Sequence, residues 1–149
     1  METTNKPNPL LILRIVWAAI FFSPCYFSLI LMTTTREIQP LDENFVRIIG
    51  AIALISLTIS IVLPDFLFKR FVEATRGKTT DALITQQFMV LSTLRFALTE
   101  AVAIYGLILG LRFGVNYYYP FWAMSSLGML SAFPTSSALQ KRLESARFP

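Results

Sequence analysis

The chain has 149 residues, of which 54% are hydrophobic, 13% are aromatic and 15% are charged, and its formal net charge is +4. Soluble domains usually contain about 25% charged residues, so this chain is short of side chains that water solvates. Histidine is absent and Cys25 is the single cysteine, which excludes histidine-based general bases, histidine–metal sites, internal disulfides and multi-cysteine metal clusters. We therefore expect no cofactor and no metal ion, and the composition gives little support to an enzyme that acts on its own.

Four long apolar segments account for the hydrophobic composition. A hydrocarbon core of about 30 Å needs roughly 20 helical residues, and each segment is close to that length. Only helices and closed barrels satisfy the backbone polar groups in lipid, and these runs are too long and too uniform for barrel strands. We therefore predict an all-α integral membrane protein, a single domain over residues 1–149, with four transmembrane helices in an antiparallel bundle. The helices are expected at about residues 10–32, 45–68, 82–112 and 117–134.

The first apolar segment, residues 10–32, contains one charge, Arg14, close to its start. A secretory signal peptide or a lipoprotein anchor at Cys25 is the alternative interpretation of this N-terminus. However, the run is long for a signal peptide, Pro24 stands where a small residue should precede Cys25, and the hydrophobicity continues beyond it. We therefore expect a membrane helix in which Cys25 is a small buried hydrophobic residue.

The second apolar segment, residues 45–63, follows a short polar loop in which Asp42 or Asn44 is a candidate N-cap. The run is interrupted by Pro64-Asp65, and the next residues, FLFKRFVEATRGK, combine aromatic side chains with cations. This combination is typical of a helix that extends into the headgroup layer.

The third apolar segment, residues 88–111, is preceded by Gly77, a candidate C-cap of the second helix, and by Thr79 and Thr80, candidate N-caps of the third. It is the only segment with two charges well inside it, Arg95 and Glu100.

The fourth segment, residues 117–134, is the weakest because it contains several serines and glycine. Its first residues are mostly aromatic, which is typical of a membrane interface. The tail after Pro134 is polar, and we expect a short surface helix there.

The positive charges indicate the orientation of the helices. One side of the predicted membrane has many more cations, namely Lys6, Arg14, Lys69, Arg70, Arg76, Lys78, Lys141, Arg142 and Arg147. The other side has Arg36, Arg47 and Arg112. We therefore expect both termini and the middle loop in the cytoplasm, in a multi-pass protein of a bacterial cytoplasmic (inner) membrane. The basic groups are expected to meet anionic lipid rather than nucleic acid.

Glu100 is the residue that most suggests a function. An ionised carboxylate at mid-bilayer costs about 2.5–3.5 kcal/mol on insertion scales, and intramembrane ionisable residues usually have a function. A carboxyl group that takes up and releases a proton at this depth is the minimal part of a proton carrier. The alternative is a structural charge pair with Arg95. Five residues correspond to about 7.5 Å of rise and roughly 140° of rotation, so this pair is awkward within one helix.

The stretch at residues 97–109, ALTEAVAIYGLIL, resembles the ion-carrying helix of the proteolipid c subunits of rotary (F-/V-type) ATPases. In that family an intramembrane Glu is followed by a small residue and then by an apolar Tyr-Gly-Leu turn. Here these positions are Glu100, Ala101 and Tyr105-Gly106-Leu107. The resemblance implies that Glu100 is the proton-carrying carboxylate and that Tyr105 helps to shape its pocket.

The resemblance also bears on the ion that is carried. Sodium-selective members of the family supply extra polar ligands, a Gln in the partner helix and a Ser or Thr beside the Glu. In this chain Ala101 follows Glu100, although Thr99 precedes it, and the second helix offers only Ser56, Thr58 and Ser60. A proton is therefore expected rather than sodium.

Three functions remain open from the sequence. The first is a proteolipid-like subunit that carries protons through Glu100 within an oligomeric complex. The second is a non-catalytic structural or scaffold subunit of a larger membrane complex, in which Glu100 and Arg95 contact neighbouring subunits. The third, a membrane enzyme, has little support. The expected partners are the lipid bilayer and other membrane subunits or copies of the same chain.

Overall fold

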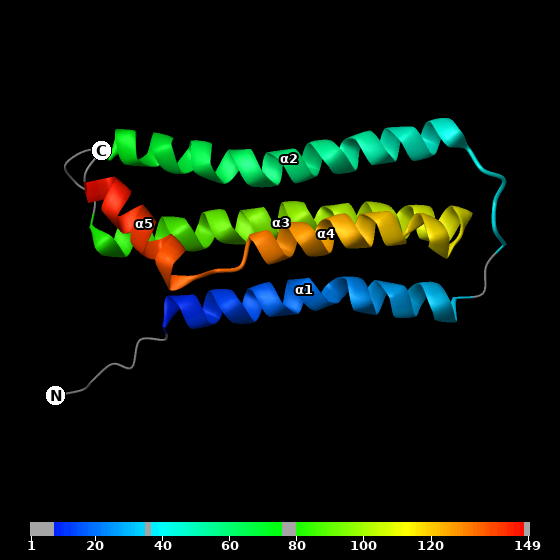
Figure 1. The fold of residues 1–149 in the computed structure, drawn as a ribbon, viewed down its shortest axis with the longest axis horizontal. Helices are drawn as coiled ribbons and strands as arrows, with labels where there is room; N and C mark the ends of the chain where they lie inside the picture. Colours follow the sequence, from blue (N-terminus) through cyan, green and yellow to red (C-terminus); the bar gives the residue numbers. More distant parts are fainter. Residues whose placement is uncertain (1–7, 35–36, 76–79, 148–149) are drawn as a thin grey trace.

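The computed structural model describes residues 8–34, 37–75 and 80–147, and this part of the chain contains helices and no strand. The helices are α1 (Pro9–Thr33), α2 (Glu43–Ala74), α3 (Asp81–Phe113), the 3-10 helix η1 (Val115–Tyr117), α4 (Tyr119–Ser131) and α5 (Ser136–Arg147). Consecutive long helices are antiparallel, and α5 lies across one end of the bundle (Figure 1). The predicted all-α class is confirmed. We call the two ends of the bundle the α5 end and the η1 end.

Three helices, α1, α2 and α3, are long and apolar enough to cross a membrane. The predicted fourth span is not confirmed, because α4 has only 13 residues and ends at Ser131. At 1.5 Å per residue it covers about 20 Å, which is less than the roughly 30 Å of a hydrocarbon core. The chain then continues without helical structure until α5 begins at Ser136.

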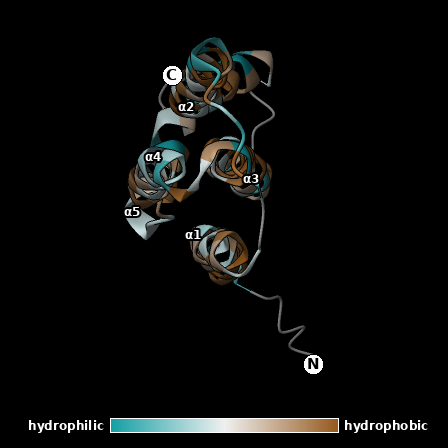
Figure 2. Cartoon of the chain, turned by 90° about the vertical axis from the view of Figure 1, so that its right-hand side faces the viewer, coloured by the Kyte–Doolittle hydropathy of each residue, from teal (hydrophilic) through white to brown (hydrophobic). Residues whose placement is uncertain are grey.

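The centre of the bundle is formed by α3 and α4, which lie between α2 on one side and α1 on the other (Figure 2). Helix α3 packs against α1, α2, α4 and α5. The side chains of α3 therefore contact each of the other α-helices.

The starts of the long helices are set by side-chain caps. The carboxylate of Asp42 accepts a hydrogen bond from the backbone N–H of Phe45 at the start of α2. The hydroxyl of Thr80 accepts one from the N–H of Leu83 at the start of α3. Each cap satisfies a helical donor that has no partner within the helix. Of the sequence candidates, Asp42 and Thr80 are thus the N-caps.

The end of α2 differs from the sequence interpretation. The helix continues through Pro64 to Ala74, past the expected end at residue 68, and Thr75 is its C-cap. The predicted C-cap Gly77 and the candidate Thr79 lie outside the described residues. The last turns are amphipathic, because Phe68 is buried whereas Lys69 and Arg70 are exposed. The α5 end of α2 is therefore held by packing against the rest of the bundle.

Three apolar clusters fill the bundle from the α5 end to the η1 end. The first consists of Phe68, Val72, Ile84, Leu91 and Ala146. The second consists of Leu13, Phe88, Phe96, Met129 and Ala132. The third consists of Ala53, Val102, Leu109, Phe113 and Phe121. Residues of α3 take part in every cluster, which keeps α3 fixed along its length.

Cys25, which we expected to be buried, is exposed. It lies on the outward face of α1 together with Phe22 (61% exposed) and Leu29 (56%), which are three and four residues away, and with its neighbour Tyr26 (64%). Because α1 is at the edge of the bundle (Figure 2), no other helix of the described residues covers this face.

Two glycines of α3 permit a close approach of other elements. A Cβ atom at Gly106 would lie 2.5 Å from the Cβ of Phe121 on α4, and one at Gly110 would lie 3.0 Å from a methyl carbon of Leu31 on α1. Gly114 ends α3 with a φ of 110°, which is a conformation that favours glycine. These positions bring α4 and α1 close to the half of α3 that follows Glu100.

Candidate functional site

Glu100 is half-buried on α3, at the border between its packed face and its outward face. Its neighbours Phe96 and Thr99 are fully buried. Ala97 and Ile104, three residues before and four residues after it, are exposed and lie beside it on the helix surface. The carboxyl group is therefore accessible from the outside of the bundle at a level well inside the apolar stretch of α3.

The backbone around Glu100 is held by polar contacts with α4. The Thr99 hydroxyl donates to the carbonyl oxygen of Arg95 (2.8 Å), one turn earlier. The Ser125 hydroxyl on α4 donates to the carbonyl oxygen of Thr99 (3.0 Å), in a buried position. These bonds fix the level and rotation of α3 at Glu100.

The carboxyl of Glu100 makes no hydrogen bond and no ion pair within the described part of the chain. In particular, Arg95 does not pair with it. The rotation of roughly 140° between these positions directs the two side chains to different sides of α3. Glu100 therefore has no fixed counterion among the residues that the structure describes.

Arg95 points to α4 instead. Its Nη2 donates to the hydroxyl oxygen of Ser131 (3.0 Å), and the Ser131 hydroxyl donates to the carbonyl oxygen of Gly128 (2.7 Å). The Nε atom of Arg95 is buried and has no hydrogen-bond partner among the described residues.

The C-terminal end of α4 receives two further donors, both from α1. Nε1 of Trp17 donates to the carbonyl oxygen of Met129 (2.8 Å). Nε of Arg14 donates to the carbonyl oxygen of Pro134 (3.3 Å). A helix C-terminus carries a partial negative charge and unsatisfied carbonyl groups, so cations and N–H donors stabilise it. This arrangement gives Arg95 a structural role, because its contact with Ser131 holds the C-terminal end of α4.

Tyr105, the predicted pocket residue, lies on another side of α3 from Glu100. It packs against the cluster that contains Ala53 of α2 and Val102 and Leu109 of α3. Five residues again separate it from Glu100, which corresponds to roughly 140° of rotation. The side chains of Tyr105 and Glu100 therefore do not lie next to each other on the surface of α3.

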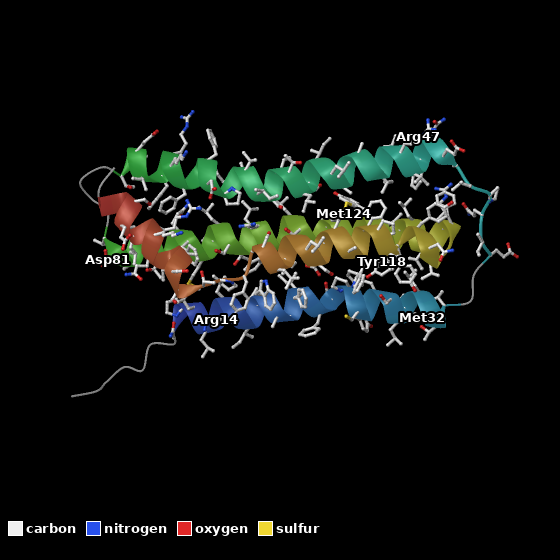
Figure 3. The ribbon with its side chains drawn as sticks, viewed as in Figure 1. Arg14, Met32, Arg47, Asp81, Tyr118 and Met124 are labelled. Carbon is white, nitrogen blue, oxygen red and sulfur yellow. The ribbon has the colours of Figure 1, made fainter. Side chains whose placement is uncertain are left out.

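Two contacts were not predicted from the sequence. The hydroxyl of Tyr118 is buried and donates to the carbonyl oxygen of Pro24 in α1 (2.5 Å), and Figure 3 shows this side chain between α4 and α1. Arg142 of α5 forms an ion pair with Asp65 of α2. In the sequence, Asp65 is noticeable as an acid directly after an apolar run. Its partner Arg142 is 77 residues away, so the sequence does not indicate the ion pair.

No group of three or more Cys, Asp or Glu side chains that could hold a metal ion occurs in the described ranges. Comparison of the chain with protein-family models, with curated proteins and with solved structures found no match. The half-buried, unpaired carboxyl of Glu100 is therefore the feature on which a functional proposal can rest.

Proposed function

We propose that the chain is a membrane-embedded subunit of an oligomeric complex and that Glu100 carries protons by reversible protonation. The observation that carries this proposal is that Glu100 is half-buried at the border of the outward face of α3 and has no ion-pair partner within the described residues. The resemblance of residues 97–109 to the proteolipid c subunits of rotary ATPases agrees with this role and favours protons over sodium.

That Glu100 has no fixed counterion within the described ranges matters for the chemistry. A carboxylate that is locked to an arginine keeps its charge, because releasing the partner would leave an uncompensated charge in a poor solvent. Arg95 is engaged with Ser131, so Glu100 is free to be neutral when it faces lipid and to ionise when it meets a polar partner or water. A change between these two states is the elementary step of proton transfer through a membrane protein.

We further propose that the chain crosses the membrane four times and that both termini lie in the cytoplasm. The membrane is the inner (cytoplasmic) membrane of a bacterium. The fourth crossing combines α4 with residues 132–135. Non-helical backbone is tolerated at membrane depth where protein covers it, and the N–H groups of Ala132 and Phe133 and the carbonyl of Pro134 are all hydrogen-bonded. The α5 end carries exposed cations such as Lys69 and Lys141, which supports its cytoplasmic placement.

The proton-carrier proposal is tested by three substitutions of Glu100, in vesicles made from membranes that contain the assembled protein. We expect Glu100→Gln and Glu100→Ala to abolish proton flux, since neither side chain can bind and release a proton. Glu100→Asp should retain part of the flux. Glu73→Gln, the same change at an exposed residue near the end of α2, is the matched control and should leave the flux unchanged. Flux at the wild-type level in Glu100→Gln would contradict the proposal.

The alternative is a scaffold subunit in which Glu100 hydrogen-bonds to a neighbouring chain. It is favoured by the position of the carboxyl beside the small exposed residue Ala97, where another helix can approach. Such contacts contribute about 0.6–2 kcal/mol each in membranes. In that case Glu100→Gln, which still forms hydrogen bonds, should assemble normally, whereas Glu100→Ala should lose the partner. The mass of the detergent-extracted particle measures this difference.

A further inference from the structure

A cavity with both polar and apolar walls lies at the α5 end of the bundle, separate from Glu100. Its volume is about 130 Å³, far above the roughly 10–15 Å³ that one water molecule requires. Its walls come from α2, α3, the segment that follows α4, and α5. The polar side chains that line it are Asp65, Ser92, Arg95, Ser131 and Arg142. Asp65 is 66% exposed, so the cavity can be reached from outside the protein.

The cavity contains more positive than negative charge. Arg142 is paired with Asp65 and also lies over the ring of Phe68, with its Cζ 4.4 Å from the ring centroid. Arg95 forms no ion pair among the described residues, although the charge of Asp65 acts on it across the cavity, and its buried Nε has no acceptor there. A buried donor of a charged group is costly to leave without a partner. The site therefore has two guanidinium groups, only one of which forms an ion pair among the described residues, beside the hydroxyl of Ser92.

We propose that this cavity binds an anionic phosphate group. Guanidinium groups recognise phosphate through paired, charge-assisted hydrogen bonds, and the hydroxyl of Ser92, which also lines the cavity, adds a neutral donor. The cavity begins beside Pro64 and Asp65, where the apolar run of α2 ends, which is the level expected for lipid headgroups. Either an anionic phospholipid headgroup or free inorganic phosphate offers this chemistry.

The charges around the cavity agree with an anion. The facing groups are Arg95 on α3, Arg142 on α5, Asp65 on α2 and the carbonyl end of α4 near Ser131. The end of a helix contributes about half of a negative charge. Two full positive charges outweigh this contribution and one carboxylate, so a bound phosphate would meet net positive charge.

The proposal is tested by binding measurements on the full chain in detergent micelles. Native mass spectrometry counts the phospholipids that the protein retains in the presence of phosphatidylglycerol or phosphatidylcholine. In a second arm, inorganic phosphate is added to phosphatidylcholine micelles and binding is followed by calorimetry. The variants are Arg95→Gln, Arg95→Lys and Arg142→Gln. The matched control is Arg47→Gln, which removes the same charge from an exposed ion pair with Glu43 at the η1 end.

We expect one phosphate-bearing ligand per chain, with affinity about tenfold weaker in Arg95→Gln and Arg142→Gln, since charge-assisted hydrogen bonds are lost. Arg47→Gln should bind as the wild type does, and Arg95→Lys should retain part of the affinity. Binding of phosphatidylglycerol alone identifies a lipid headgroup, and binding of inorganic phosphate identifies the free ion. Arg142 lies outside the long helices, so its variant remains informative if Arg95→Gln fails to fold. Equal binding by the wild type, Arg142→Gln and Arg47→Gln, or no binding in either arm, would overturn the proposal.

Discussion

At the scale of single residues, Arg95 and Glu100 take different roles although both lie within the apolar stretch of the same helix. The sequence predicts their depth, and the rotation of roughly 140° predicts that they diverge. It does not predict what each side chain meets, because that depends on α4, whose Ser131 accepts the hydrogen bond from Arg95. A contact between residues 36 positions apart in the chain leaves no periodic pattern in the sequence.

Tyr118 gives the first prediction at this scale. Its buried hydroxyl joins the start of α4 to the carbonyl of Pro24 in α1. We expect Tyr118→Phe to lower the free energy of unfolding by about 0.5–1.5 kcal/mol, which is the usual net contribution of one hydrogen bond. Denaturation in mixed micelles, followed by circular dichroism, measures the change.

The control for Tyr118 is Tyr26→Phe, since Tyr26 is 64% exposed and the same hydroxyl is removed. It should change the stability by much less. If the two variants were equally stable, the hydrogen bond to Pro24 would contribute nothing and the contact between α4 and α1 would depend on packing alone.

At the scale of elements, the sequence predicts α1, α2 and α3 well because long apolar runs have one stable conformation in lipid. It predicts α4 less well. Hydropathy counts residues 132–134 as part of the helix, whereas the structure ends the helix at Ser131. Trp17 of α1 donates to the carbonyl of Met129 in the last turn of α4, and Arg14 of α1 donates to the carbonyl of Pro134 in the segment that follows. Partners that come from another helix leave no local pattern in the sequence.

The contact between α3 and α4 gives the second prediction. A Cβ atom at Gly106 would lie 2.5 Å from the Cβ of Phe121, so Gly106→Ala must push α4 away from α3. We expect it to lower the free energy of unfolding by about 1–3 kcal/mol, as overpacking does. Gly50→Ala is the matched control, because a Cβ there meets nothing within 4 Å.

The control variant should be as stable as the wild type or slightly more stable, since alanine favours a helix over glycine. The same denaturation experiment compares the two substitutions. Equal effects at Gly106 and Gly50 would mean that α4 does not pack against α3 at this distance.

At the scale of the whole molecule, the two ends of the bundle differ in their charged residues. Figure 3 places Arg14 and Asp81 at the α5 end and Arg47 at the η1 end. The sequence-based orientation assigns the α5 end to the cytoplasm. This assignment can be tested by labelling single cysteines in a chain in which Cys25 is replaced by Ser.

We expect Gln140→Cys on α5 to react with a membrane-impermeant thiol reagent only when the cytoplasmic face is accessible. Glu37→Cys, in the exposed connection between α1 and α2, should react only from the opposite face. Inverted vesicles expose the cytoplasmic face to the reagent, and whole cells expose the opposite face. Reaction of both cysteines from the same face would contradict the bundle crossing the membrane from one end to the other.

The central claim, that Glu100 changes its protonation state within the membrane, is tested most directly by infrared spectroscopy of the reconstituted protein over a range of pH. The account predicts that the signal of protonated carboxyl groups grows as the pH falls and that Glu100→Gln lacks the part contributed by the intramembrane carboxyl, while the control Glu73→Gln keeps that part. A spectrum in which the Glu100 carboxyl stays in one protonation state over the whole range would contradict the account.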